Sequence, residues 1–480
     1  MQKKFLSNLI LMVFLNLLIK PLAIFGIDAQ VQNQVGTEEY GMYFSLFNFT
    51  YIFNILLDLG ITNYNVKYVA QYPVLVKRYM GKIIPLRLFL FLIYVLFSGL
   101  LAIGLGYNGN QLTILGVLVF NQFLVSVILY LRSYFAGLLN FRLDALFSVL
   151  DKLLLILICG TLLYHPYFKD GFNLSWFVGA QTASYLITVV LVFLLLFKQT
   201  GIPVLRWSPA FNKVMLIQSF PYALLILLMM LYNRIDAIMI ERIHQEGKLQ
   251  AGIYAQSYRI LDAFVMFAML FTNLLLPLFS RQIKESISPR LLLTTSSKLI
   301  STFAFIATVT CVFFPEDILR VFYTDVSQDS VDVFRCVILS FIPNCAIMLY
   351  GTLLTANGSM KMLNIYSFIG LIANILMNLF FIPWWGALGA AFATFLTQGL
   401  LAVSQIIYVH LIFRFSVSLP ELVRYLSFIG LLILLNYGLL KYFNGVTSIL
   451  ISLLSSGCIA FLTRMISLKE LLHTLKKENK

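Results

Sequence analysis

The feature that most constrains this chain is a succession of apolar stretches, each about long enough to cross a membrane and each followed by a short polar turn. A helix needs about 20 apolar residues to cross the hydrocarbon core of a bilayer. Of the 480 residues, 60% are hydrophobic and 11% are charged, whereas soluble domains are about half apolar and about a quarter charged. The chain is therefore predicted to be an all-α polytopic membrane protein, which excludes a soluble enzyme, a disordered chain and a disulfide scaffold.

The apolar windows predict about 14 transmembrane helices. The expected spans are 5–26, 41–62, 83–106, 112–131, 145–164, 174–197, 214–233, 251–279, 293–314, 331–354, 363–382, 387–412, 425–440 and 446–463. Lys3 and Lys4 before the first apolar run resemble the start of a signal peptide, but Lys20-Pro21 stands where a cleavage site would follow. We therefore expect the first run to be an uncleaved span.

Basic residues orient the chain. With the amino terminus inside, the inner loops and tails hold 22 Lys and Arg and the outer loops hold six. The positive-inside rule then predicts that both termini are cytoplasmic. The net charge of +14 has the same explanation and does not indicate nucleic acid, because the basic residues form no single patch. Since no loop reaches 30 residues, the chain has no room for an extramembrane catalytic domain.

Cysteines and histidines give no sign of a metal or cofactor. The five cysteines lie in apolar stretches without metal-ligand spacing and are expected to be buried. The four histidines are scattered, so no metal site and no cofactor are expected. Most of the 43 Phe and 25 Tyr are expected to face lipid or the membrane interface.

A short motif occurs twice in the same orientation. The segments Gly36–Tyr43 and Gly247–Tyr254 both read G-x4-G-x-Y, 211 residues apart, and each precedes a span on the outer side. Agreement in spacing, sidedness and span number indicates that spans 1–6 are duplicated as spans 7–12. Parallel repeats of this kind are an established transporter plan, with the binding site between the halves.

The duplication predicts the domain organisation. Residues 1–200 would form an N-lobe from spans 1–6, and residues 201–415 a C-lobe from spans 7–12. Residues 416–463 would add spans 13 and 14, and residues 464–480 a cytoplasmic basic tail.

Several stretches resemble one family. They are Asn16-Leu-Leu-Ile-Lys-Pro21, Val35-Gly-Thr-Glu-Glu-Tyr-Gly41, Leu57-Asp-Leu-Gly-Ile61 and Val69-Ala-Gln71. Together they are similar to the start of the bacterial oligosaccharide flippases, the Wzx-type members of the polysaccharide transporter family in the multidrug/oligosaccharidyl-lipid/polysaccharide exporter superfamily. The Gly- and Ala-rich stretch Ile382–Thr394 resembles the beginning of span 12 in that superfamily.

The resemblance implies a fold and a function. The fold would be two six-helix lobes forming a V-shaped central cavity that opens alternately to each side. The function would be to move undecaprenyl-diphosphate-linked oligosaccharide repeat units from the cytoplasmic to the outer leaflet of the bacterial inner (plasma) membrane, for O-antigen, lipopolysaccharide, capsule or exopolysaccharide synthesis. We expect coupling to H+ or Na+, polysaccharide polymerase machinery as a partner, and a monomer by default.

Charged residues inside the spans are the candidate substrate site. A charge at the centre of a span costs about 2.5–3.5 kcal/mol on insertion scales, so its presence needs a reason. Arg259, Arg234 and Lys20 are expected to face the cavity and hold the diphosphate, which arginine can bind bidentately. Under the repeat register Arg259 aligns with Asn48, which is expected to line the same site. The alternative is that Lys20 and Arg234 only extend to the outer interface.

Four carboxylates are candidates for ion coupling: Asp262, Asp236, Asp58 and Asp151. A buried carboxylate can bind a proton or sodium ion in one conformation and release it in another. The alternative for each is structural pairing. Asp262 shares a helix face with Arg259, Asp151 neighbours Lys152, and the Asp58-Leu-Gly segment can end a helix.

Three other functions remain open. A drug/cation antiporter of the same superfamily would need only twelve spans. A lipid II flippase would have fourteen. A membrane enzyme of glycan polymerisation or ligation would need a long outer loop with catalytic Arg or His, and the loops of this chain are short.

Overall fold

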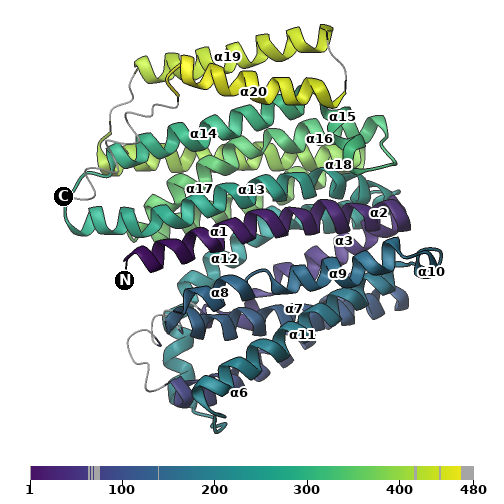
Figure 1. The fold of residues 1–480 in the computed structure, drawn as a ribbon, viewed down its shortest axis with the longest axis vertical. Coiled ribbons are helices and arrows are strands. Elements are labelled where there is room, and N and C mark those ends of the chain that lie inside the picture. The colour runs from purple at the N-terminus through teal and green to yellow at the C-terminus, as the bar shows by residue number, and fades with distance from the viewer. Residues whose placement is uncertain are drawn as a thin grey trace. The chain divides into compact units, whose positions relative to one another are not determined.

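The protein is described by a computed structural model that covers residues 2–62, 65, 69, 76–138, 140–415, 419–442 and 445–465. All but the first two residues of the predicted basic tail lie outside this range. Within the described residues every regular element is a helix and none is a strand (Figure 1). The predicted all-α membrane fold is confirmed.

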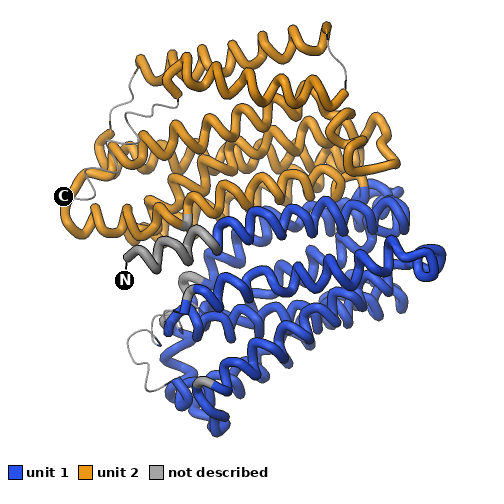
Figure 2. Tube along the Cα trace, in the orientation of Figure 1, with its two compact units in different colours: residues 1–252 blue, residues 253–480 orange. Residues whose placement is uncertain are grey.

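The chain divides into two compact units, Met1–Gly252 and Ile253–Lys480 (Figure 2). The helices that lie in unit 1 are α1 (Gln2–Ala23), η1 (Ile24–Asp28), α2 (Ala29–Val35), α3 (Thr37–Ile52), α4 (Ile55–Asp58), α6 (Val76–Gly104), α7 (Gly109–Gly137), α8 (Phe141–Phe147), α9 (Leu150–Tyr164), α10 (Pro166–Lys169), α11 (Leu174–Thr200) and α12 (Pro209–Ile243).

Helix α13 (Gly247–Lys284) begins in unit 1 and continues into unit 2. Unit 2 further holds α14 (Arg290–Phe313), α15 (Pro315–Phe322), α16 (Gln328–Leu339), α17 (Phe341–Ala356), α18 (Met360–Phe413), α19 (Leu419–Tyr442) and α20 (Val446–Leu462). The boundary between the units falls after Gly252 because α12 packs on α3. The division into lobes by the repeat, at residue 200, stays a prediction.

Eleven helices in the described part of the chain are long and apolar enough to cross a membrane. The predicted second span is interrupted between α3 and α4, and α20 has only 17 residues. Helix α18 counts once in the eleven although it holds two of the predicted spans. The multi-pass membrane architecture is therefore established, and the number of fourteen remains a prediction.

Helix α18 turns back on itself at Gly386. Its 54 residues would extend about 80 Å at 1.5 Å per residue, far more than the bilayer core. Gly386 has φ +51° and ψ −126°, a conformation that favours glycine. At Gly389 an added Cβ would lie 2.5 Å from the carbonyl oxygen of Phe381. The Gly- and Ala-rich stretch therefore makes a tight turn between two apolar segments.

Two of the predicted spans contain breaks, and the helix end expected at Asp58-Leu-Gly is present. After α3, Phe53 leaves the helical conformation, and after α4 Leu59 adopts a left-handed one with φ +43°. The predicted span 331–354 is divided at Ser340 into α16 and α17. Conversely, Asp28 lies in the π-helix η1, where an outer loop was expected, since α1, η1 and α2 follow one another without a gap.

The parts of the two repeat motifs that belong to unit 1, residues 36–43 and 247–252, pack against each other. A Cβ on Gly41 would lie 2.0 Å from the carbonyl oxygen of Lys248, and one on Gly252 would lie 2.0 Å from that of Thr37. Gln32 adds a hydrogen bond from its Nε2 to the Gly252 carbonyl oxygen at 3.1 Å. The spacing shared by the two motifs thus corresponds to a close approach of the first turns of α3 and α13, where a Cβ on Gly41 or Gly252 would collide with backbone atoms.

Each unit has its own packing. In unit 1, α7 packs against α11, α3 and α6, and α1 packs against α8 and α9. In unit 2, α17 packs against α18, and α14 packs against α16, α17, α19 and α20. The appended pair α19–α20 is held by an apolar cluster that includes Phe428, Leu432 and Ala460.

Side-chain burial bears on two expectations. Most of the aromatic residues were expected to face lipid or the interface, and six tyrosines are exceptions that are fully buried: Tyr40, Tyr43, Tyr94, Tyr130, Tyr134 and Tyr254. Their hydroxyls can join buried polar contacts, as Tyr94 does with the Thr50 carbonyl oxygen at 2.7 Å. Of the cysteines, Cys458 is exposed and Cys336 is half-buried, while the other three are buried as expected.

Candidate functional site

Three of the predicted substrate-binding residues lie in unit 1 on different helices. Lys20 is half-buried on α1, and Asn48 is buried on α3 with 1% exposure. Arg234 on α12 places its guanidinium carbon 5.4 Å from the ring centroid of Tyr51. Lys20 interacts electrostatically with Asp151 on α9, which brings one predicted cation near one predicted coupling residue.

Asp151 and Asp236 have different surroundings. The Asp151 carboxylate pairs with the Lys152 ammonium at 3.3 Å. Lys152 also donates to the Tyr185 hydroxyl at 3.3 Å and lies 5.2 Å from its ring centroid. Asp236 on α12 is fully buried. For Asp151 these contacts favour the structural alternative of pairing.

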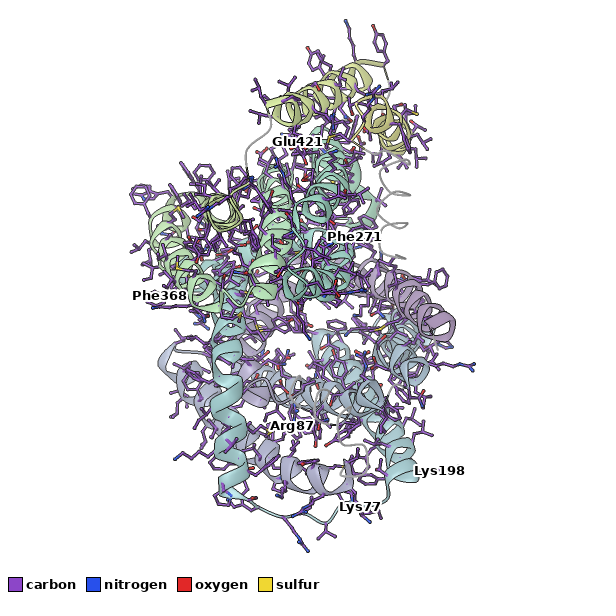
Figure 3. All side chains as sticks on the ribbon, turned by 90° about the vertical axis from the view of Figure 1, so that its left-hand side faces the viewer. Lys77, Arg87, Lys198, Phe271, Phe368 and Glu421 are labelled. Carbon is purple, nitrogen blue, oxygen red and sulfur yellow. The ribbon has the colours of Figure 1, made fainter. Side chains whose placement is uncertain are left out.

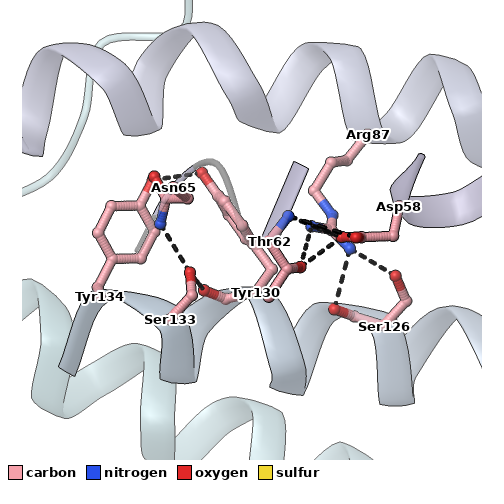
Figure 4. A network of polar contacts seen from close by, with 8 residues as sticks. All are labelled: Asp58, Thr62, Asn65, Arg87, Ser126, Tyr130, Ser133 and Tyr134. Carbon is pink, nitrogen blue, oxygen red and sulfur yellow. Dashed lines mark hydrogen bonds and ion pairs between the residues drawn. The ribbon is translucent and has the colours of Figure 1, made fainter. Parts of the chain in front are cut away.

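Asp58 takes part in a network of polar contacts in unit 1. Its carboxylate pairs with the guanidinium of Arg87 on α6 at 3.0 Å (Figure 4). The same carboxylate accepts the backbone N–H of Thr62 at 3.1 Å and its hydroxyl. Arg87 donates to the Ser126 carbonyl oxygen on α7 at 3.0 Å and to the Ser126 hydroxyl. The Arg87 guanidinium carbon also lies 4.6 Å from the ring centroid of Tyr130.

A second group of polar contacts continues this network along α7. The Tyr130 and Tyr134 hydroxyls are 2.5 Å apart, and Asn65 donates to the Ser133 hydroxyl at 2.7 Å (Figure 4). Asn65 follows the break in the second span, so its contact with α7 helps to fix the chain beyond that break. We define the Arg87 network as these eight residues: Asp58, Thr62, Asn65, Arg87, Ser126, Tyr130, Ser133 and Tyr134.

The location of the Arg87 network explains its composition. Backbone groups freed by a break inside a membrane span need partners within the protein. Asp58 ends α4 immediately before the left-handed Leu59, and its carboxylate supplies such a partner to Thr62. Arg87 is only 4% exposed and lies inside unit 1, away from the end that carries Lys77 and Lys198 (Figure 3). Its charge is matched by Asp58.

Sequence reasoning missed Arg87 as a functional or structural residue. A signal was present, because Arg87 is a single charge within the apolar run Ile83–Leu105. Its partner Asp58 is 29 residues away along the chain, which no helical spacing would suggest. The contact favours the structural alternative for Asp58.

Unit 1 contains a polar pocket of about 600 Å³. In the predicted topology this pocket lies on the outer side of the membrane. In its wall the Glu241 carboxylate accepts from Gln111 at 2.8 Å and pairs with Arg242 at 2.9 Å. The Arg242 guanidinium carbon lies 3.7 Å from the ring centroid of Tyr107. Burial, together with the nearby Glu241 charge, raises the pKa of the Tyr107 hydroxyl.

Arg259 and Asp262 lie in unit 2 on α13, where Arg259 is 8% exposed and Asp262 is half-buried. Lys298 on α14, which sequence reasoning did not single out, is also 8% exposed. Arg259 follows the first residue of α13 by twelve positions, which places it about 18 Å along the helix axis. Its charge is therefore deep within a candidate span.

Unit 2 also encloses a cavity of about 400 Å³ between α14, α17, the end of α18 and the start of α19. Arg290, His410 and Glu421 are its charged or titratable lining residues, and Tyr350 and Tyr425 add hydroxyls. Among the described residues no group of three or more His, Cys, Asp or Glu side chains could hold a metal ion.

Solved structures with this fold are transporters and flippases. The lipid II flippase MurJ in an inward closed conformation matches with a TM-score of 0.75 and 15% identity over 96% of this chain and 100% of that chain. An inward-facing multidrug resistance MATE family transporter of the MOP superfamily matches with a TM-score of 0.66 and 15% identity over 85% and 98%. These likenesses establish the fold.

Sequence comparison identifies the family. An uncharacterized membrane protein, MJ1375 of Methanocaldococcus jannaschii, is 26% identical over 379 residues, which are 76% of this chain and 88% of that protein. The sequence profile of the family described as "Polysaccharide biosynthesis protein" matches residues 5–283. This match covers more than half of the chain, in agreement with the resemblance found in its motifs. The chain belongs to the polysaccharide biosynthesis protein family.

Proposed function

We propose that this protein is a flippase that moves undecaprenyl-diphosphate-linked oligosaccharide repeat units from the cytoplasmic to the outer leaflet of a bacterial inner membrane. It would serve surface polysaccharide synthesis and would work by alternating access. Family membership supports a role in polysaccharide synthesis, and the fold is that of flippases and transporters.

The observation that carries the proposal is the buried positive charge of unit 2. Arg259 and Lys298 are each only 8% exposed within candidate membrane spans. An intramembrane charge is expensive and marks a substrate or ion pathway by default. A diphosphate carries the opposite charge, and a guanidinium can bind it with two parallel hydrogen bonds. Arg259 is therefore the residue proposed to bind the diphosphate, with Lys298 as a second cation.

Membership of the polysaccharide biosynthesis protein family favours a polysaccharide precursor over the cationic substrate of a drug antiporter. Arg234, Lys20 and Asn48 remain further candidates for the substrate path. For ion coupling, Asp262 and Asp236 remain candidates for binding a proton or sodium ion. The observed pairs of Asp58 and Asp151 favour structural roles for those two.

A lipid II flippase is the second candidate. The match to MurJ extends over 96% of the chain, whereas the MATE match extends over 85%. Both lipid II and the proposed substrate carry a polyprenyl diphosphate, so a diphosphate site would suit either. Family membership favours the polysaccharide precursor.

The experiment is leaflet exchange in proteoliposomes. Purified wild-type protein is reconstituted with a fluorescent undecaprenyl-diphosphate oligosaccharide, and exchange is followed by quenching from outside. The variants are Arg259→Ala and the charge-retaining Arg259→Lys. Arg320→Ala is the control, because Arg320 is exposed and pairs with its helix neighbour Glu316 at the surface.

We expect wild-type exchange, loss of most of it in Arg259→Ala, partial recovery in Arg259→Lys, and a normal rate in Arg320→Ala. If an Arg259→Ala protein folds normally and exchanges the lipid at the wild-type rate, Arg259 does not bind the diphosphate. Exchange of lipid II alone would select the second candidate.

A further inference from the structure

The segment that joins α11 to α12 forms an ordered surface on α6. The Arg206 backbone N–H donates to the Gly81 carbonyl oxygen at 2.8 Å. A Cβ on Gly81 would lie only 2.1 Å from the Val204 carbonyl oxygen. Gly201 begins the segment with φ +74°, and its Cβ position is 3.4 Å from the Lys77 Nζ. The connector therefore lies directly across the first turns of α6.

Aromatic contacts fix this surface from both sides. The Trp207 ring meets Phe89 edge-on, with centroids 5.6 Å apart. Phe211 in the first turn of α12 lies 5.8 Å from Tyr79, centroid to centroid. The Lys82 Nζ stands 5.0 Å from the centroid of the Phe211 ring.

The charged residues of this surface are all basic. Its basic residues come from α6, the end of α11, the connector and the start of α12: Lys77, Arg78, Lys82, Lys198, Arg206 and Lys213. Segments 76–82 and 198–213 contain no Asp or Glu. All but Lys82 are exposed. Figure 3 shows Lys77 and Lys198 at the same end of unit 1.

The connector also exposes apolar side chains beside these charges. Ile202 is 73% exposed, Val204 64%, Leu205 56% and Trp207 52%. The candidate spans of α6 and α11 begin at Val76 and end at Lys198, so the connector lies where the membrane meets water. Tryptophan favours that depth, and apolar side chains next to basic ones are typical of segments that rest in an anionic lipid interface.

We propose that this surface, defined as segments 76–82 and 198–213, binds the phosphate head groups of anionic phospholipids of the surrounding bilayer. The basic side chains attract the head groups, and Ile202, Val204, Leu205 and Trp207 enter the acyl boundary. Each Lys or Arg near an anionic membrane contributes about a fivefold preference. The inference is independent of the substrate that the protein transports.

The test uses Trp207 as its reporter. The other three tryptophans, Trp176, Trp384 and Trp385, are replaced by Phe in the full-length chain, which is then placed in nanodiscs. These contain equal fractions of phosphatidylglycerol and phosphatidylcholine, with bromine on the acyl chains of one lipid or the other. A lipid that accumulates at the surface quenches Trp207 more strongly when it carries the bromine.

The charge is tested with Lys77→Gln/Lys198→Gln/Arg206→Gln. The matched control, Lys169→Gln/Arg320→Gln/Arg335→Gln, removes three exposed basic residues elsewhere. Circular dichroism and monodisperse elution establish that each variant is folded.

We expect stronger quenching by brominated phosphatidylglycerol, at least a tenfold loss of that preference in the first triple variant, and no loss in the control. High salt should weaken the preference. Equal quenching by the two lipids, or an unchanged preference in the first variant, would overturn the proposal. Loss of the preference on addition of inorganic phosphate at matched ionic strength would also overturn it, since the surface would then bind free phosphate.

Discussion

Replacing Arg87 tests whether the Arg87 network stabilises the break in the second span. Arg87→Met keeps the length and apolar stem of the side chain and removes its charge. The variant loses the ion pair with Asp58 and the hydrogen bonds to Ser126. Removing one partner of a buried pair costs about 3–5 kcal/mol, because the other charge is left uncompensated. Since the Asp58 side chain is 22% exposed, we expect the lower end, about 3 kcal/mol.

This free energy predicts a measurable shift in melting temperature. For a domain of 150–250 residues, 1 kcal/mol corresponds to about 2–4 °C. Unit 1 comprises Met1–Gly252, so Arg87→Met should melt about 6–12 °C below the wild type. Cys159, which is fully buried in α9, reports unfolding through a thiol-reactive dye. The other four cysteines, all in unit 2, are replaced by alanine beforehand.

A double variant separates pairing from simple loss of packing. Arg87→Met/Asp58→Leu removes both charges, and replacing a whole buried pair by apolar residues is often nearly neutral. The double variant should therefore be at least about 1 kcal/mol more stable than the sum of the two single changes predicts. Lys169→Met is the control, because Lys169 is an exposed cation of unit 1 and its charge should contribute about 0–1 kcal/mol. A melting temperature of Arg87→Met within 2 °C of the wild type, or strictly additive effects, would refute the reasoning.

Three further substitutions test other contacts by the same thermal assay. Gly252→Ala should destabilise the protein by about 1–3 kcal/mol because its Cβ would overlap the Thr37 carbonyl oxygen, whereas Gly179→Ala meets nothing within 4 Å; equal effects of the two would contradict this packing. Ser452→Ala removes bonds to α19 and α14 and should cost about 0.6–1.7 kcal/mol; because Ser452 lies in unit 2, the reporting thiol is here the buried Cys311 of α14, and an unchanged melting temperature would disprove the value. Glu241→Ala removes the acceptor of the Gln111 amide N–H and the ion-pair partner of Arg242 and should cost about 1–3 kcal/mol; wild-type stability would show that water replaces the carboxylate.

Hydropathy alone predicted much of this architecture. A run of about 20 apolar residues has few ways to be stable except as a membrane helix. For this reason the ends of α6, α7 and α11 agree with the predicted spans to within seven residues. The turn at Gly386 was also visible, because a proline, two tryptophans and two glycines stand together between apolar runs.

The breaks and the polar contacts could not be predicted in the same way. Phe53 interrupts its span without a proline nearby, so local propensity gives no warning there. At Ser340 a signal was present, because Pro343 lies in the first turn of α17 and cannot continue the hydrogen bonds of α16. The partner of Arg87 comes from another helix, and the glycines of the repeat motifs meet only after folding. Such features depend on which helices become neighbours, and a hydropathy profile contains no information about neighbours.

In the candidate substrate site, too, some features were predictable from the sequence and others were not. A deep Arg259 was predictable from its position in an apolar span, whereas the burial of Lys298 was not, because it lies among the polar residues Thr294–Ser301. The structure further gives partners for two of the candidate carboxylates, since Asp58 and Asp151 pair with basic residues at 3.0 Å and 3.3 Å. Pairing distances of this kind are properties of the folded protein.

The central claim is that the protein moves an anionic polyprenyl-diphosphate oligosaccharide, and one comparison tests it most directly. Wild-type protein in a single proteoliposome preparation is assayed for leaflet exchange of that lipid and for transport of a permanently cationic dye, each under proton and sodium gradients. The account predicts exchange of the lipid, well above that of protein-free liposomes, and no dye transport. Dye transport without lipid exchange would contradict it and identify the protein as a cation antiporter.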